Sequence, residues 1–234
     1  MATFVLVHGA WHGGWVWRDV GPLLEAAGHR VLTPTLTGMG DRLHLLSPAT
    51  GVAQHAEDIA AHIAHMEAED VVLVGHSYGA RPTALACAAS VVGRWISLDG
   101  VAVAKGSTLL DGAPAEAVAA ARAARVMGGL ATPPLPPEAI GVPADHPGHA
   151  WVRRRLTPLP WRCLEEPMPA LPARFAGLPR AYVEATRNSL AGPRAGRAQA
   201  EAEGWPVVAI DSGHNLPVTA PTEVAEALLR LAAA

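Results

Sequence analysis

Short apolar runs alternate with helical stretches along most of this chain, and this alternation restricts the possible folds more than any other feature. The runs are typical of buried strands and lie at residues 4–7, 29–33, 70–74, 94–98, 180–184 and 207–210. Apolar residues at helical spacing predict helices at residues 14–27, 55–67, 78–89 and 222–231. Buried strands connected by helices predict an α/β fold with a doubly wound, mostly parallel sheet that is covered on both faces.

The regular alternation stops between residues 101 and 179. This stretch contains alanine-rich helical pieces, a proline-rich run at residues 132–137 and two tryptophans. It is too long for a loop in a compact domain. We therefore expect residues 101–179 to form a helical cap, inserted into a single domain whose core is made by residues 1–100 and 180–234.

Composition excludes several classes of partner. The chain has 234 residues, of which 50% are hydrophobic and 17% charged, and its net charge is -3. We therefore expect no nucleic-acid partner. No apolar run has the length of a membrane span, and the first residues lack the features of a signal peptide. Because Cys87 and Cys163 are far apart and are interpreted as reduced thiols, we expect a cytoplasmic protein. The oligomeric state stays open, because an exposed apolar cap could pair two subunits in a homodimer.

The strongest chemical signal is the sequence Gly-His-Ser-Tyr-Gly at residues 75–79. It follows an apolar strand and precedes a predicted helix, which is the setting of a nucleophile on a sharp strand-to-helix turn. The two glycines leave room for that turn, and Ser77 would project its hydroxyl over the edge of the sheet. The sequence therefore predicts Ser77 as a nucleophile.

A serine hydroxyl needs a base to remove its proton. His214 follows the last predicted strand and precedes the last helix, so it is expected at the same edge of the sheet as Ser77. The order of serine before histidine along the chain also fits this type of fold. We therefore predict His214 as the base.

An acyl-transfer intermediate carries a negatively charged oxygen that needs two N–H donors. Residues 8–14 follow the first strand and are rich in small side chains, so their backbone can approach a reacting group closely. We assign the N–H of Ala10 as one donor and the N–H of Tyr78, the residue after the nucleophile, as the other. Together they form the predicted oxyanion hole.

Metal and cofactor sites are not expected. A metal site on the helix with His55, Asp58, His62 and His65 is conceivable, but a solvated helix face is the favoured interpretation, because no further ligand cluster is visible. The start of a dinucleotide motif at residues 38–40 is not completed, since Leu43 stands where the third glycine would be. We predict a protein without a cofactor.

These motifs together resemble one branch of the α/β-hydrolase superfamily. The sequence His-Gly-Ala-Trp-His-Gly-Gly-Trp at residues 8–15, the serine motif at 75–79 and Gly213-His214 are similar to those of plant methylesterases, hydroxynitrile lyases and bacterial esterase-like proteins. The resemblance extends over nearly the whole chain and implies the α/β-hydrolase fold. It specifies the fold and the nucleophile much more strongly than the substrate.

The position of the acid that orients the histidine differs from the pattern of the family. In the plant proteins it follows the strand that corresponds to residues 180–184, and Asn188 occupies that place here. An amide cannot stabilise the imidazolium, so the triad is either weakened or completed from elsewhere. Asp99 is the best alternative, because it ends the strand next to that of Ser77; Asp211 and Glu184 are weaker candidates.

The function that this sequence favours is a serine hydrolase, an esterase that cleaves a small, largely hydrophobic carboxylic ester through an acyl-enzyme intermediate. Two alternatives stay open. One is a non-hydrolytic enzyme on the same fold: a lyase, a cyclase or another natural-product tailoring enzyme. The resemblance speaks against cyanohydrin cleavage, since Asn215 stands where the plant lyases have a lysine. The other is a small-molecule binding protein on this scaffold.

Overall fold

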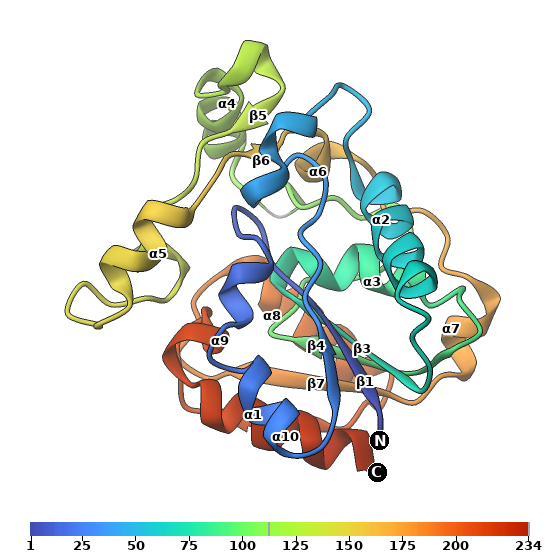
Figure 1. Cartoon of the computed structure of the whole chain (residues 1–234). Helices are drawn as coiled ribbons and strands as arrows, with labels where there is room; N and C mark the ends of the chain where they lie inside the picture. The colour runs from blue at the N-terminus through green and yellow to red at the C-terminus, as the bar shows by residue number, and fades with distance from the viewer. Residues whose placement is uncertain (112, 234) are drawn as a thin grey trace.

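A six-stranded parallel sheet forms the centre of the molecule (Figure 1). The computed structural model describes residues 1–111 and 113–233. Every neighbouring pair of strands in this sheet is parallel. In spatial order the strands are β2 (Arg30–Leu32), β1 (Thr3–Val7), β3 (Val71–His76), β4 (Val92–Leu98), β7 (Arg180–Ala185) and β8 (Val207–Ile210). This arrangement confirms the predicted fold class.

Helices cover both faces of the sheet, and their bounds are as follows. They are α1 (Gly21–Ala26), α2 (Val52–His65), α3 (Ala80–Ala86), α4 (Ala115–Ala123), α5 (His149–Arg155), α6 (Arg162–Glu165), α7 (Ala173–Gly177), α8 (Ala191–Ala202), α9 (Leu216–Thr219) and α10 (Pro221–Ala233). Short 3-10 turns lie at Gly14–Trp17, Gly40–Leu45, Ser77–Gly79, Met127–Gly129 and Pro137–Ile140. None of the helices in the described ranges is long and apolar enough to cross a bilayer.

The strands are apolar on both faces because each face has its own hydrophobic core. In β1, Val5 and Val7 pack with residues of α2 and α3, whereas Phe4 and Leu6 pack with residues of α1 and α10. Side chains alternate between the two faces of a strand, so a strand covered by helices on both sides needs hydrophobic residues at every position. This constraint explains the uninterrupted apolar run at the start of the chain.

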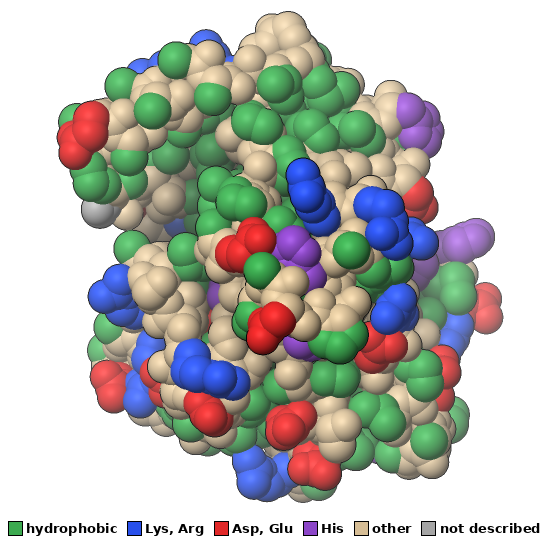
Figure 2. Space-filling model, turned by 90° about the vertical axis from the view of Figure 1, so that its left-hand side faces the viewer, with side chains coloured by type: hydrophobic (Ala, Val, Ile, Leu, Met, Phe, Trp, Pro, Cys, Tyr) green, Lys and Arg blue, Asp and Glu red, His purple; other side chains and the backbone are tan. Residues whose placement is uncertain are grey.

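The segment from 101 to 179 connects two strands that are neighbours in the sheet, β4 and β7. It contains α4 to α7 and a two-stranded antiparallel ribbon, β5 (Ala131–Thr132) with β6 (Leu159–Pro160). In Figure 1, α4, α6 and this ribbon lie at the top of the molecule and α5 extends to one side. Figure 2 shows a hollow between this upper lobe and the body, with hydrophobic side chains along its walls.

The expectation of one helix over residues 14–27 is wrong. A 3-10 turn ends at Trp17, and α1 begins only at Gly21. Pro22 is the physical reason, because it has no backbone N–H to donate and is tolerated only in the first turn of a helix. The helix therefore restarts immediately before the proline.

Helix α8 has no counterpart among the predicted helices. Its buried residues are Pro193, Gly196 and Ala200, which carry too little apolar surface to give a hydrophobic pattern. A Cβ atom on Gly196 would collide with the carbonyl oxygen of Gly100, so the helix lies against the chain just after β4. Close backbone packing, rather than large apolar side chains, holds this helix in place.

We expect Gly75→Ala to lower the free energy of unfolding by about 1–3 kcal/mol, because the new methyl group would overpack a filled site. Its Cβ would lie 2.5 Å from the carbonyl oxygen of Gly79 and 2.7 Å from Cα of Ala80. Urea denaturation of the variant measures the loss. Gly177→Ala is the matched control, since a Cβ there meets nothing within 4 Å; equal stability of the two variants would contradict the packing argument.

Candidate active site

Ser77 lies on a strained turn at the carboxyl end of β3. Its φ is +54°, a left-handed conformation that is uncommon for residues other than glycine. The strand lies between β1 and β4, so the serine is at the middle of the sheet edge. The turn is crowded: a Cβ on Gly79 would lie 2.6 Å from the carbonyl oxygen of His8. Glycine at this position therefore permits the turn that presents the partly exposed Ser77 hydroxyl.

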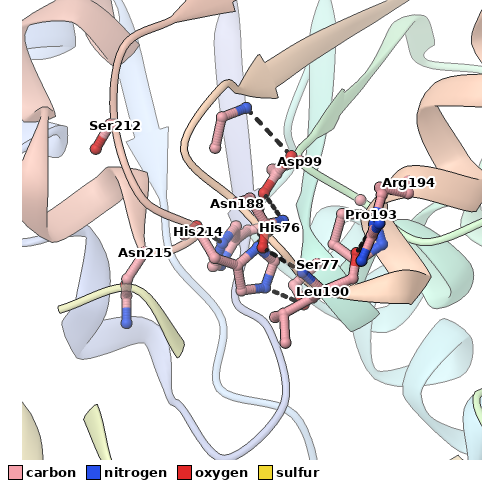
Figure 3. A network of polar contacts seen from close by, with 12 residues as sticks. His76, Ser77, Asp99, Asn188, Leu190, Pro193, Arg194, Ser212, His214 and Asn215 are labelled. Carbon is pink, nitrogen blue, oxygen red and sulfur yellow. Dashed lines mark hydrogen bonds and ion pairs between the residues drawn. The ribbon is translucent and has the colours of Figure 1, made fainter. Parts of the chain in front are cut away.

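The structure brings Ser77, His214 and Asp99 into one chain of hydrogen bonds (Figure 3). His214 Nε2 lies 2.8 Å from Ser77 Oγ, and His214 Nδ1 lies 2.7 Å from Asp99 Oδ2. The histidine is in the loop between β8 and α9, and the aspartate directly follows β4. Both side chains are buried. Because Nδ1 donates to the carboxylate, Nε2 carries the lone pair that faces the serine hydroxyl.

Asp99 is held by backbone groups as well as by His214. The N–H of Asp99 donates to the carbonyl oxygen of Val183 at 2.6 Å, and the N–H of Ala185 donates to Asp99 Oδ1 at 3.2 Å. Its φ is +43°, so this residue is also in the left-handed region. Its position next to β7 thus fixes where the carboxylate points.

Asn188 contacts two of these three residues. The sequence did not reveal this contact. Asn188 Nδ2 donates to Asp99 Oδ2 at 2.6 Å and lies 3.3 Å from His214 Nδ1. The position at which the plant proteins have their acid thus contacts the same imidazole in this structure. Asp211, by contrast, is exposed and pairs with Arg187, and Glu184 pairs with Arg197.

The oxyanion loop, residues 8–13, follows β1 and runs beside the nucleophile. A Cβ on Gly9 would lie 2.9 Å from Ser77 Cβ, so this loop and the serine turn are in close contact. Within the described residues, the N–H of Ala10 makes no hydrogen bond. Tyr78 is in the first turn of a helix, where N–H groups have no intrahelical acceptor. Among the described residues, neither N–H group predicted for the oxyanion hole has a backbone acceptor.

Two buried histidines hold this loop, and sequence reasoning assigned them no role. His8 Nε2 accepts from the N–H of Leu36 at 3.1 Å. His12 Nδ1 donates to the carbonyl oxygen of Ala10 at 2.7 Å, and its Nε2 accepts from Asn215 Nδ2 at 2.9 Å. Burial lowers the pKa of His8 to about 3 and that of His12 to about 4, so both are neutral near pH 7.

The Tyr78 side chain anchors the same turn to α2 and α6. His55 Nε2 lies 2.8 Å from the carbonyl oxygen of Thr37, to which it donates, so its Nδ1 accepts from the Tyr78 hydroxyl at 2.8 Å. The phenol oxygen also lies 3.2 Å from Cys163 Sγ. His55 is completely buried, so the expectation that it belongs to a solvated helix face is wrong. Burial also lowers its pKa to about 4.

Metal ligands do not gather at this site. In residues 1–111 and 113–233, no three His, Cys, Asp or Glu side chains are arranged to hold a metal ion. The chemistry that the arrangement supports directly is transfer of the Ser77 proton to His214, with two N–H groups nearby to stabilise a developing negative charge.

Comparison with known proteins places the chain in a family. Residues 4–227 match the model of the alpha/beta hydrolase family, and the chain belongs to this family. The carbendazim hydrolyzing esterase of Nocardioides sp. (strain SG-4G) is 36% identical over 99% of this chain and 100% of its own. Methylesterase 2 of Arabidopsis thaliana is 45% identical over 36% of this chain and 32% of its own length.

A solved structure agrees with this assignment. The pyrethroid hydrolase of Sphingobium faniae JZ-2 has a TM-score of 0.77 and 27% identity, over 100% of this chain and 98% of its own. These findings confirm the predicted resemblance. Because the relatives are esterases and hydrolases, they support ester hydrolysis as the broad activity.

We expect stability to fall as the pH drops from 7 to 5.5. A histidine with a depressed pKa in the folded state binds its proton mainly after unfolding, so each such histidine lowers the free energy of unfolding by about 1 kcal/mol over this interval. Denaturation of His55→Gln at both pH values should show a pH dependence smaller by that amount. The exposed His44→Gln is the control; an unchanged slope in His55→Gln would contradict the assignment of a neutral buried His55.

Proposed function

We propose that this protein is a serine hydrolase that cleaves a small, largely hydrophobic carboxylic ester through an acyl-enzyme intermediate. The observation that carries the proposal is the hydrogen-bonded chain from Ser77 through His214 to Asp99. A hydroxyl 2.8 Å from an imidazole lone pair is within reach for proton transfer. The family and the esterases related to the chain support the same reaction class.

The first half of the reaction forms the acyl-enzyme. Ser77 Oγ attacks the ester carbonyl carbon while its proton moves to His214 Nε2, and the carbonyl oxygen becomes negatively charged. The N–H groups of Ala10 and Tyr78 donate to this oxygen. The ionised Asp99 stabilises the imidazolium. His214 then gives its proton to the departing alkoxide, which leaves as an alcohol.

The second half restores the enzyme. A water molecule gives its proton to His214 Nε2 and attacks the acyl carbon, and the acid is released when Ser77 Oγ regains the proton. The buried, neutral His8 and His12 keep the oxyanion loop in place in both halves, because they hold it by hydrogen bonds without adding charge. His214 is therefore the only one of these three histidines to which we give a proton-transfer role.

The substrate class is inferred from the surroundings of the site. The 101–179 segment contacts the oxyanion loop, since the N–H of Thr157 donates to the carbonyl oxygen of Trp11 and Ala10 packs against the cluster that contains Leu159. The hollow beneath the upper lobe has hydrophobic walls (Figure 2). Apolar walls with few polar groups favour ligands that are largely hydrophobic. The carbendazim hydrolyzing esterase, which resembles this chain, supports an ester as the substrate.

The residue after His214 does not favour the lyase alternative. Asn215 is fully buried, and its amide donates to His12 Nε2. In Figure 3 its side chain points away from Ser77. No positive charge is thus supplied next to the base by this residue, and hydrolysis is the better-supported reaction.

Ser77→Ala is expected to reduce kcat for p-nitrophenyl esters by at least about 10⁴-fold, because it removes the attacking oxygen. It should also abolish the covalent adduct that a fluorophosphonate probe forms with the wild-type protein, as measured by mass spectrometry. Ser90→Ala, at an exposed serine, is the matched control. A wild-type protein that shows neither turnover nor adduct, yet binds an apolar ligand, would favour a binding protein instead.

Asp99→Asn is expected to lower kcat/KM by about 10³- to 10⁴-fold, because the imidazole loses the carboxylate that fixes its tautomer. Asn188→Ala should lose much less, since the carboxylate of Asp99 remains. Steady-state kinetics on the same ester compare the two variants, with circular dichroism to verify folding. Equal, small losses in both would refute Asp99 as the acid.

A further inference from the structure

Two donors converge on one oxygen beside the candidate base. Asn188 Nδ2 lies 2.6 Å and His214 Nδ1 lies 2.7 Å from the same atom, Asp99 Oδ2. The two nitrogens are 3.3 Å apart. Residue 188 follows β7, and residue 99 follows the neighbouring strand β4. Side chains from two adjacent strand ends thus reach the same edge of one imidazole (Figure 3).

The orientation of the Asn188 amide is determined by its surroundings. The backbone N–H of Leu190 donates to Asn188 Oδ1 at 2.9 Å. The oxygen end of the amide therefore faces the backbone, and the NH₂ end faces Asp99, because a flipped amide would place two donors against each other. Asn188 cannot accept a hydrogen bond from His214 in this orientation.

The pairing of donors and acceptors then determines which ring nitrogen of His214 carries the proton. Asp99 Oδ1 receives the N–H of Ala185, and Oδ2 receives the two side-chain donors. A carboxylate without a proton accepts all three hydrogen bonds, whereas a protonated acid or an amide does not. His214 accordingly donates from Nδ1 and keeps its lone pair on Nε2, toward Ser77.

We infer that Asn188 is a positioning residue that acts through Asp99, and that the acid and the amide at positions 99 and 188 can exchange places. This inference rests on the proposed function. In the exchange variant D99N/N188D, the amide oxygen at position 99 keeps the N–H of Ala185, and the NH₂ group at that position points to the new carboxylate. The carboxylate at position 188 keeps the N–H of Leu190 on one oxygen and accepts from His214 on the other. Once the imidazole turns its Nδ1–H from the amide at position 99 toward the carboxylate at position 188, where Asn188 Nδ2 lies 3.3 Å away in the wild type, every donor is paired again.

The single variant Asp99→Asn breaks this pairing. Two amide NH₂ groups and the Nδ1–H of His214 then face one another without an acceptor, which favours the tautomer with its proton on Nε2. That proton points at Ser77, so the imidazole cannot accept the serine proton. Asn188→Asp instead places two carboxylates in contact, and the added negative charge favours the protonated imidazole.

The test compares kcat/KM of the wild type, Asp99→Asn, the exchange D99N/N188D and D99N/N188A on one p-nitrophenyl ester. We expect the exchange to regain about 100-fold over Asp99→Asn, from the loss of about 10³- to 10⁴-fold that a missing acid causes. D99N/N188A has no acid at either position and should stay at the level of Asp99→Asn. An exchange variant that is folded, as judged by its melting temperature, but no faster than Asp99→Asn would overturn the inference.

A proton NMR measurement separates this inference from the proposed function. The Nδ1–H proton of His214, bonded to a carboxylate, should give a far-downfield resonance in the wild type and in the exchange variant, and none in Asp99→Asn. This pattern supports the inference even if the wild type hydrolyses no ester, which would contradict only the proposed function. Absence of the resonance from the exchange variant would contradict the inference about Asn188.

The variant Asn188→Asp decides the question if the exchange protein does not fold. We expect the acidic limb of its kcat/KM profile to move to higher pH than in the wild type, because the second carboxylate stabilises the protonated imidazole. A purely structural role for Asn188 would change the height of the profile without moving that limb. A profile that keeps the wild-type limb would overturn the inference.

Discussion

The turn that follows β3 is the constraint on which the rest of the site depends. Ser77 has a φ of +54° there, and the chain on both sides is in contact with other backbone: Gly75 with the turn itself and Gly79 with the end of β1. This crowding leaves the serine little freedom to relax, so strain is held by the surrounding sheet. The oxyanion loop then packs against the same turn, through Gly9.

Strain is concentrated around this edge of the sheet. Six described residues other than glycine have positive φ, and three of them, Trp11, Ser77 and Asp99, belong to the oxyanion loop, the nucleophile turn and the acid. Each follows the end of a strand, at the edge where parallel strands direct their carboxyl ends. Two cores on opposite faces of the sheet fix these strand ends, and the three strained residues are held in place by that packing.

Neutral polar side chains hold the loops around the hydrogen-bonded pair of Asp99 and His214. Burial keeps His8, His12 and His55 uncharged, and each is hydrogen-bonded to the backbone of the oxyanion loop or of residues 36 and 37. Because they add no charge beside the imidazole, they can hold the loops without favouring either protonation state of the base. Asn188 is a further neutral group of this kind, since its amide donates a hydrogen bond to the carboxylate of Asp99.

The sequence was sufficient to predict the parallel sheet, the burial of its strands on both faces, and Ser77, His214 and Asp99 at strand ends, because periodicity and chain order carry this information. It could not determine α8, whose small residues leave no hydrophobic pattern, or the break before Pro22. The contacts among Asn188, Asp99 and His214 arise from the packing of the folded chain. Hydrogen-bond partners far apart in the chain depend on distances of a few tenths of an ångström, and these arise only when neighbouring strands pack side by side.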